Sequence, residues 1–284
     1  MNSTRNFGFV ILHYKSFEMT KLCVNQLLAI FPVENVKIVI VDNGSNNNSG
    51  ESLVKYYDSK KNVTVILNEK NIGFARGNNI GFEYLKKLNC LDFMVIMNND
   101  IIINDDLFID KVISIYNKNK FDVLGPDIYC LADDYHQNPI RENGYTLEQI
   151  KKLIKYHKQR KYFPFVYYLK EKILKVSRPT DNIFDRSKEY LNPVLHGAFY
   201  IFSRNFVKNR QYAFCPDTFL YAEEDILYEE CKSSGFLMMY SPQIFVTHLE
   251  HFSTKMSLNS EYQRLNFMNN NALESLKILK KKMF

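Results

Sequence analysis

Residues 36–45 read VKIVIVDNGS, a β-branched run that ends in four turn-forming residues. Val and Ile favour extended backbone because their branched side chains pack well on a pleated surface. Asp, Asn, Gly and Ser favour turns, and Asp and Ser also cap helices. The stretch therefore predicts a strand over Val36–Val41, a turn over Asp42–Ser45 and a helix after it.

The segments on either side repeat this pattern of strand and helix. Apolar strand-like runs lie at Phe7–His13, Val63–Leu67 and Leu91–Met97, and helix-like segments lie between them at Glu18–Ile30 and Gly73–Leu88. Strands that alternate with helices indicate βαβ units, whose crossover helices cover both faces of a parallel sheet. The fold class expected is therefore α/β, with a mainly parallel central sheet and helices on both faces.

Three polar clusters follow directly on predicted strands, at Asp42–Ser45, Asn68–Asn71 and Asn98–Asp100. Parallel strands bring their carboxyl ends to one edge of the sheet, and ligands of open α/β sheets bind beyond that edge. We therefore expect these three clusters to contribute to one binding site.

The second half of the chain is less regular. Residues 145–178 are rich in Lys, Arg, Tyr and Phe and predict one or two helices, broken near Pro164 and inserted into the main domain. Strand-like Leu195–Ser203 follows, then a helix over Glu223–Ser234, strand-like residues up to Thr247 and a last helix with a basic end. No internal repeat or long linker divides the sequence, so we expect one domain with an inserted helical segment.

The composition narrows the class of protein. The chain has 284 residues, a net charge of +6 and five scattered cysteines without a CxxC pair, which indicates reduced thiols in the cytosol. A moderate positive charge fits anionic ligands or an anionic membrane surface and does not by itself indicate nucleic acid. The N-terminus carries no signal-peptide pattern, and no apolar run approaches the roughly 20 residues that span a bilayer. Any membrane contact is therefore expected to be peripheral.

Six motifs, in order along the chain, carry a resemblance to a known family. They are VILHYKS (residues 10–16), IVIVDNGSNNNS (38–49), LNEKNIGFARGNNIG (67–81), VIMNND (95–100), LHGAFYIFS (195–203) and FLYAEEDILYEECKSSGF (219–236), the last followed by VTH (246–248). The chain resembles family 2 glycosyltransferases with the GT-A fold, nearest the bacterial rhamnosyl- and capsular-polysaccharide-type branch. The resemblance implies transfer of a sugar, with inversion, from a UDP- or dTDP-sugar to a hydroxyl of a cell-surface glycan.

The resemblance also implies a set of donor-binding residues. Asp42, the acid of the DNGS motif, would accept hydrogen bonds from the base or ribose, although a turn Asp caps a helix without any ligand. Arg76 would bind phosphate or base, or else is a solvated surface arginine. Gly197 would allow close approach of the donor sugar, or else is a plain glycine of a buried strand. The nucleotide-sugar-binding residues expected are Asp42, Asn43, Asn71, Gly73, Arg76, Asn79, Asn99 and Gly197.

Asn98-Asn99-Asp100 occupies the place of the DxD motif of this family. Nucleoside diphosphates need a hard divalent cation, and Mg²⁺ or Mn²⁺ takes carboxylate and phosphate oxygens as ligands. Because Asn98 replaces the first acid, Asp100 is the one charged ligand of the motif. His248 resembles the late histidine that completes the metal site, whereas a lone histidine without such a context is more often structural. We expect Mn²⁺ or Mg²⁺ on Asp100 and His248.

The acidic run Glu223-Glu224-Asp225 opens a predicted helix. Acids near a helix N-terminus stabilise it by about 0.3–1 kcal/mol each, which accounts for one or two of the three without any catalytic role. The resemblance places the general base of the transfer here, since one carboxylate must take the proton of the attacking hydroxyl. Glu223-Glu224 and Glu224-Asp225 both match the family's pair of acids. Glu224 belongs to both alignments and is the expected base, with Glu223 and Asp225 as alternatives.

The basic and aromatic insertion has two interpretations. It is either a solvated helical hairpin whose aromatics pack on the main domain, or a surface for an anionic membrane at the cytoplasmic face, where Lys and Arg heads with Tyr and Phe bodies fit the interface. An acceptor carried on a polyprenyl diphosphate would lie at such a surface, and Lys280–Lys282 would add charge to it. Asp217 and Tyr221 are candidates for acceptor contact, and Lys255 for phosphate contact.

These expectations describe one GT-A domain over residues 1–284. It comprises a nucleotide-binding half (1–127), a helical insertion (130–190), an acceptor and catalytic half (191–257) and a C-terminal helix (258–284). A sugar-phosphate nucleotidyltransferase would more often show a Gly-rich basic loop where this chain has His13-Tyr14-Lys15-Ser16. A non-catalytic nucleotide-sugar-binding module would account for Asn98 but not for the acidic run. No zinc-finger or RNP-type pattern indicates a nucleic-acid partner.

Overall fold

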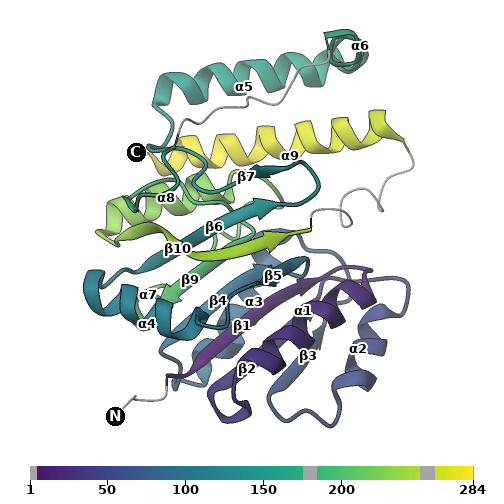
Figure 1. The fold of residues 1–284 in the computed structure, drawn as a ribbon. Helices are drawn as coiled ribbons and strands as arrows, with labels where there is room; N and C mark the ends of the chain where they lie inside the picture. Colours follow the sequence, from purple (N-terminus) through teal and green to yellow (C-terminus); the bar gives the residue numbers. More distant parts are fainter. Residues whose placement is uncertain (1–4, 175–183, 250–259, 284) are drawn as a thin grey trace.

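Strand β1 (Phe7–His13) lies inside the central sheet and contributes side chains to two hydrophobic cores, one on each face. Phe7, Phe9 and Ile11 are buried in one core, and Val10 is buried in the other. This alternation is that of a strand whose two faces are both covered. The computed structural model describes residues 5–174, 184–249 and 260–283, whose arrangement is shown in Figure 1.

The first half of the sheet is parallel, as the sequence predicts. Its strands are, in sheet order, β3 (Val63–Leu67), β2 (Val36–Asp42), β1 and β4 (Phe93–Asn98). The elements between them are α1 (Phe17–Ile30), the 3-10 turn η1 (Val33–Asn35), α2 (Ser49–Tyr57) and α3 (Phe74–Lys87). Every strand and helix predicted for this half is confirmed, with ends that differ by one or two residues.

The second half of the sheet mixes parallel and antiparallel pairs. It continues from β4 through β9 (Phe199–Ser203), β6 (Val123–Cys130) and β10 (Met238–His248) to β5 (Ile101–Ile103), with β7 (Tyr135–His136) beside β6 and β8 (Tyr190–Leu191) beside β10. β9 is antiparallel to both neighbours, whereas β10 is parallel to β6. The strand predicted from Leu195 begins only at Phe199, because residues 195–198 leave the sheet and turn toward the start of a helix.

Helices cover both faces of this sheet, as predicted. One face carries α1, α2 and α4 (Phe108–Asn119), whose buried residues include Leu27 and Phe108. The other carries α3, α7 (Arg204–Asn209) and α8 (Glu223–Ser234), whose buried residues include Phe82, Phe206 and Leu227.

A further helical layer lies outside α8 (Figure 1). It consists of α5 (Leu147–Tyr162), α6 (Pro164–Leu174) and α9 (Glu261–Lys282). A small core holds this layer to the domain and is formed by Ile150, Cys215, Ile226, Leu276 and Leu279. The predicted break at Pro164 is confirmed, since proline is the first residue of α6, where its missing N–H costs nothing. Among the described residues, no helix combines the length and the apolar character needed to cross a bilayer.

Candidate active site

Sheet register brings two of the predicted polar clusters to one edge. β1 lies between β2 and β4, and its last residues pair with both: His13 lies opposite Asp42, and Leu12 lies opposite Asn98. The third cluster follows β3, whose last residue Leu67 lies opposite Asp42. Because all four strands are parallel, their carboxyl ends open on the same side, where ligands of such sheets bind.

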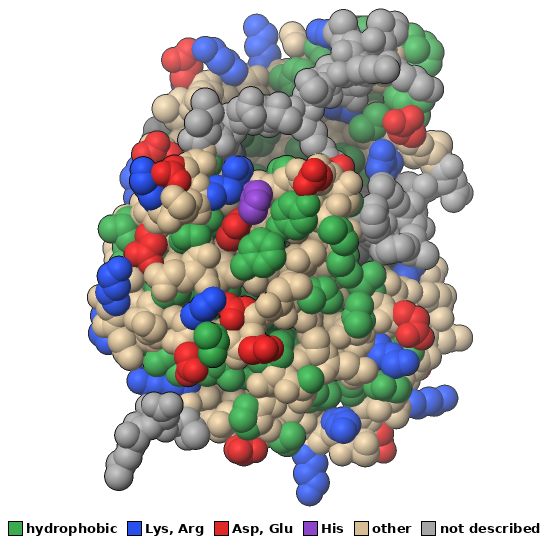
Figure 2. All heavy atoms as spheres, viewed as in Figure 1, with side chains coloured by type: hydrophobic (Ala, Val, Ile, Leu, Met, Phe, Trp, Pro, Cys, Tyr) green, Lys and Arg blue, Asp and Glu red, His purple; other side chains and the backbone are tan. Residues whose placement is uncertain are grey.

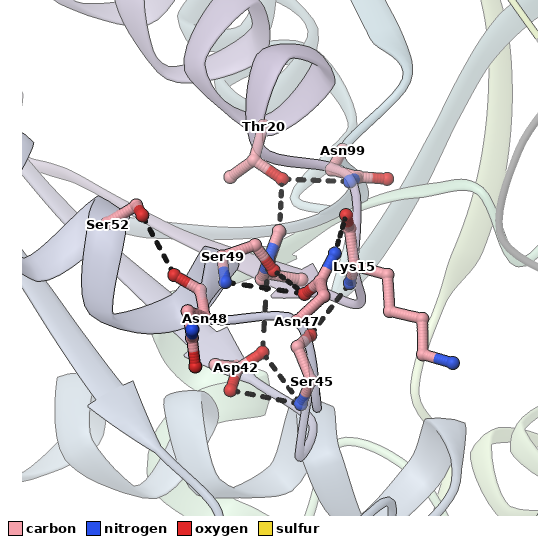
Figure 3. Close-up of polar contacts among 10 residues, drawn as sticks. Lys15, Thr20, Asp42, Ser45, Asn47, Asn48, Ser49, Ser52 and Asn99 are labelled. Carbon is pink, nitrogen blue, oxygen red and sulfur yellow. Dashed lines mark hydrogen bonds and ion pairs between the residues drawn. The ribbon is translucent and has the colours of Figure 1, made fainter.

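The buried imidazole of His13 connects the loops after β2 and β4. Figure 3 shows Thr20, Ser49 and Asn99, which take part in this connection. His13 is fully buried, with Nδ1 2.7 Å from Thr20 Oγ1 and Nε2 2.8 Å from Ser49 Oγ. Thr20 Oγ1 also accepts a hydrogen bond of 2.9 Å from the side-chain amide of Asn99. The Ser49 hydroxyl donates to Asn47 Oδ1 at 2.6 Å, so at its contact with His13 it acts as acceptor.

These contacts define one protonation state of His13. Burial lowers the pKa of His13 to about 4, so the ring is neutral at neutral pH. Its Nε2–H donates to Ser49, and its Nδ1 accepts from the Thr20 hydroxyl. The result is a single chain of hydrogen bonds that runs from Asn99 to the loop after β2. His13 belongs to the first motif, but its role could not be predicted because its partners are 7 and 36 residues away in the sequence.

Asp42 is held at the start of this loop. Its carboxylate is buried, accepts hydrogen bonds of 3.2 and 3.3 Å from the backbone N–H of Ser45, and has an oxygen 3.9 Å from His13 Nε2. Burial raises the pKa of Asp42, and the Ser45 hydrogen bonds oppose that shift. Gly44 follows with a φ of +73°, and a Cβ there would lie 2.3 Å from the backbone of Lys70. Only glycine allows this contact between the loops after β2 and β3.

Asn43 and Asn71 shape the loop that enters α3. The side-chain amide of Asn43 donates to Asn71 Oδ1 at 3.1 Å and to the Gly73 carbonyl at 3.2 Å, and its Oδ1 accepts from the Ile72 N–H at 3.1 Å. Asn71 Oδ1 accepts in addition from the Gly73 N–H at 2.9 Å. Gly73 has a φ of +89°, and a Cβ there would lie 2.4 Å from the Phe219 carbonyl oxygen. The structure therefore brings these three predicted residues together.

Arg76 and Asn79 tie α3 to the segment that precedes the acidic run. Arg76 Nε donates to the Pro216 carbonyl at 2.7 Å, and the side chain is exposed. Asn79 donates to the Phe214 carbonyl at 2.7 Å and accepts from the N–H groups of Ala213 and Phe214, both at 3.1 Å. Both polar atoms of Asn79 are therefore engaged with backbone, which gives the residue a structural role.

The two predicted metal ligands are adjacent. His248, the last residue of β10, places Nε2 3.1 Å from Asp100 Oδ1, and its Nδ1 lies 2.7 Å from Gln137 Oε1. An amide oxygen at Nδ1 favours a proton on that nitrogen, which leaves the Nε2 lone pair directed toward Asp100. Gln137 belongs to the predicted insertion, and no motif indicated it.

The donor atoms at this pair fit a divalent cation. Within residues 5–174, 184–249 and 260–283, no group of three His, Cys, Asp or Glu side chains is arranged to hold a metal ion, so this pair is short of a complete protein cage. Mg²⁺ and Mn²⁺ sites of phosphate-transferring proteins commonly use one or two protein ligands and complete the shell with phosphate oxygens and water. Asn99 contributes its amide to Thr20 instead.

The acidic run opens α8 and divides into three environments. Glu223 is buried, its Oε1 has no hydrogen-bond partner among the described residues, and burial raises its pKa to about 8. Asp225 forms an ion pair with Arg141; burial raises the pKa of Asp225 to about 7, and Arg141 opposes that shift. Burial also raises the pKa of Glu224, opposed by N–H groups of Glu224 and Gly197 and by Arg141.

The turn at residues 196–198 lies next to both the acidic run and the Asp100–His248 pair. A Cβ on Gly197 would lie 2.6 Å from Glu224 Oε1, so the absence of a side chain makes room for the carboxylate. The His196 ring lies 6.2 Å from the His248 ring, and burial together with His248 lowers the pKa of His196 to about 3. Gly197 was expected to allow close approach of a sugar, and the structure shows close approach of Glu224.

The residues just before the acidic run have an unusual backbone. Tyr221 and Ala222 have φ values of +73° and +60°, although neither is glycine. Consecutive non-glycine residues in this region are strained, and such strain persists where the surrounding structure fixes it, often at functional sites. Burial raises the pKa of Tyr221 to about 12. Asp217 is exposed, and Lys255 lies outside the described residues.

The fold and the site agree with comparisons to known proteins. The chain matches Glycosyl transferase family 2 over residues 9–211, more than half of its length, and belongs to this family. A search of curated proteins found no match.

Solved structures of similar fold include nucleotide-sugar glycosyltransferases. S. aureus TarS 1–349 in complex with UDP has 16% identity and a TM-score of 0.53, with 85% of this chain and 60% of that chain covered. GalNAc-T7 with UDP, GalNAc and Mn²⁺ has 15% identity and a TM-score of 0.61, with 89% and 46% covered. The chain thus spans less than two thirds of these relatives. The likeness establishes the fold, which is the expected GT-A fold.

Proposed function

We propose that this chain transfers a hexosyl or deoxyhexosyl group, with inversion, from a UDP- or dTDP-sugar to a hydroxyl of a cell-surface glycan. The observation that carries the proposal is the turn at 196–198, which lies next to both Glu224 and the Asp100–His248 pair. A base for the acceptor and ligands for the cation at the donor diphosphate are the two groups that such a transfer needs.

Glu224 is the residue we assign as base. The acceptor hydroxyl gives its proton to Glu224 as its oxygen bonds to the anomeric carbon, while the bond from that carbon to the diphosphate breaks and the nucleoside diphosphate leaves. Asp225 is paired with Arg141, and Glu223 has a pKa of about 8 and holds its proton at pH 7. Glu224 is therefore the carboxylate of the run best suited to accept a proton.

On the donor side, we assign nucleotide contacts to Asp42, Asn71, Gly73, Arg76 and Asn99, which lie on the loops after β2, β3 and β4 or at the start of α3. Asn43, whose side-chain oxygen and nitrogen are both engaged within these loops, supports their shape. Asp100 and His248 would hold Mn²⁺ or Mg²⁺, which supplies positive charge next to the leaving diphosphate. Asn79, engaged with backbone on both sides, and Gly197, next to Glu224, act through the structure around the site.

The acceptor we propose is lipid-linked, a growing capsule, O-antigen or exopolysaccharide chain on a polyprenyl diphosphate. The enzyme would then work at the cytoplasmic face of the membrane as a peripheral protein. The basic and aromatic composition of the insertion supports this part of the proposal.

The test of the reaction is a nucleotide-release assay on a panel of UDP-, dTDP- and GDP-sugars with Mn²⁺, Mg²⁺ or EDTA. We expect turnover of one UDP- or dTDP-sugar that depends on the added cation. If folded protein releases no nucleotide from any donor of the panel with a lipid-linked acceptor pool present, the result would contradict the proposal. It would favour a nucleotide-sugar-binding module without catalysis.

A further inference from the structure

Helices α5 and α6 meet at a tip that exposes large apolar side chains. Tyr162, Phe163, Phe165 and Val166 are consecutive except for Pro164, and they are 77%, 62%, 60% and 59% exposed. Contiguous exposed apolar groups of this kind mark interaction sites in soluble proteins. We call these four residues the apolar tip.

The helices on either side of the tip carry an excess of positive charge. Over α5 and α6 the sequence has two acidic residues, Glu171 and Glu148, and Glu148 pairs with Lys152 at 2.8 Å. The basic residues of the same stretch are Lys151, Lys152, Lys155, Lys158, Arg160, Lys161, Lys170 and Lys172. In the view of Figure 2, basic side chains stand along the upper left edge over α5, beside an acidic one, and hydrophobic side chains lie at the upper right over α6.

Helices α5 and α6, which together form an arm, are held to the domain by residues outside the apolar tip. Ile150 is buried in the core shared with α8 and α9. His157 Nδ1 lies 2.9 Å from Asn269 Oδ1, and the Asn269 amide donates to the His157 carbonyl at 3.1 Å. Tyr168 of α6 contacts Tyr262 of α9 edge to face at 5.6 Å. The arm is thus fixed to α9, and the apolar tip is left outside these contacts.

We propose that the apolar tip and its basic flanks dock on the anionic surface of a lipid bilayer. Apolar and aromatic side chains enter the boundary between headgroups and acyl chains, and Lys and Arg next to them bind anionic headgroups. This charge complementarity favours a bilayer over an acidic protein, which would not need four consecutive apolar groups at the tip. The proposal rests on the proposed function, since it brings the enzyme to the surface where a lipid-linked acceptor lies.

The basic C-terminal end lies apart from the apolar tip. Lys280–Lys282, which were expected to add charge to the membrane surface, lie at the end of α9 opposite Tyr262, where α9 packs on the start of α5, and Lys282 pairs with Glu230 of α8 at 2.9 Å. The apolar tip therefore works without the C-terminal charges. Residues 175–178 of the predicted basic segment lie outside the described residues.

Sedimentation with lipid vesicles tests the proposal on the full chain. We expect binding to phosphatidylcholine vesicles that contain about 30% phosphatidylglycerol, and at least about tenfold weaker binding to pure phosphatidylcholine or at high salt. The double variant Phe163→Ser/Phe165→Ser should bind at least about tenfold more weakly, and so should Lys158→Glu/Lys161→Glu. Lys60→Glu/Lys61→Glu is a matched control of two exposed lysines before β3, and should bind like the wild type.

Donor turnover without vesicles separates this proposal from the proposed function. Each variant should hydrolyse the nucleotide-sugar at the wild-type rate, since none of the substituted residues belongs to the site, and this rate also reports that the variant is folded. Folded, active wild type that stays in the supernatant with anionic vesicles would overturn the docking proposal and leave the reaction intact. Equal loss of binding in the Lys60/Lys61 control would also overturn it.

Discussion

Buried polar groups differ between two regions of the molecule. One is the edge of the sheet formed by the loops after β2, β3 and β4, which we call the donor edge, and the other is the acidic run at the start of α8. At the donor edge, a chain of hydrogen bonds joins the neutral side chains of His13, Thr20, Ser49 and Asn99 and lies beside the one carboxylate of the β2 loop, Asp42. At the acidic run, burial raises the pKa values of Glu223, Glu224 and Asp225, and one buried oxygen of Glu223 has no partner among the described residues.

The difference indicates how the two regions contribute to the proposed reaction. Neutral, fully bonded networks fix geometry at little electrostatic cost, so they suit a surface that must have its shape before the ligand arrives. Buried carboxylates cost free energy when charged, and a base with a raised pKa takes up a proton near neutral pH. Under the proposed function, we therefore expect the network at the donor edge to position the ligand and the acidic run to react.

The largest expected effect separates the reactive region from the positioning region. Glu224→Gln removes the proposed base while keeping the size of the side chain, and should lower transfer to the acceptor by about 10²–10⁴-fold. Asp225→Asn, whose carboxylate is paired with Arg141, should lower it less. The measurement is the initial rate of nucleotide release at saturating donor and acceptor. Near-normal turnover by Glu224→Gln would move the base to a neighbouring acid.

The next effect concerns the cation. Asp100→Asn and His248→Ala each remove a proposed ligand and should weaken Mn²⁺ binding by at least about tenfold, measured by electron paramagnetic resonance in the presence of UDP. Gln137→Leu removes only the group that faces His248 Nδ1 and should weaken binding less, by roughly 10-fold or under. Unchanged Mn²⁺ affinity in both ligand variants would place the cation elsewhere.

A smaller effect is expected from the neutral network. His13→Leu leaves the hydroxyls of Thr20 and Ser49 without their partner and should lower the free energy of unfolding by about 1–3 kcal/mol. It should also raise the KM for donor more than it lowers kcat, because the loops after β2 and β4 lose their connection. Thr20→Val removes the contacts of Thr20 with both His13 and Asn99 and keeps the contact between His13 and Ser49, so it should give a similar change in both urea unfolding and KM. A fall in kcat of His13→Leu with an unchanged KM for donor would contradict the positioning role.

The smallest effect depends on pH. The folded-state pKa of Glu223, about 8, lies above its ordinary value near 4.5, so the folded protein holds a proton that the unfolded chain releases between these values. The stability that this proton provides is present below about pH 4.5 and is lost as the pH rises toward 8. Glu223→Gln keeps a neutral group at every pH and should unfold at a temperature a few degrees higher than wild type at pH 8.5, but not at pH 5. A constant difference across this range would contradict the assignment.

The sequence predicts the parallel half of the fold well because its signals are local. Each apolar run from Phe7 to Met97 is followed by turn-forming residues, and the structure moves these ends by no more than two positions. The predicted start of β9 was wrong because LHGAFYIFS is mostly apolar and gives no sign of an interruption. Only the approach of Glu224 to Gly197 shows that the strand begins later.

The site was predictable only where a motif marks it. Asp42, Asp100, His248 and Glu224 belong to motifs that the family shares, and sheet register explains why the first two lie at one edge. The residues that support them, His13, Gln137 and Arg141, have partners 7 to 111 residues away, a distance at which no spacing rule applies. Two of the three lie in the insertion, where the sequence carries no family motif.

Nucleotide binding measured by calorimetry tests the division of roles most directly. UDP, or dTDP if the donor panel selects it, is titrated with Mn²⁺ into wild type, Glu224→Gln and Asp42→Asn. We predict equal affinity for wild type and Glu224→Gln, and affinity at least about tenfold lower for Asp42→Asn, which loses a charged acceptor at the donor edge. Unchanged binding by Asp42→Asn, or a loss in Glu224→Gln as large as that in Asp42→Asn, would contradict the account.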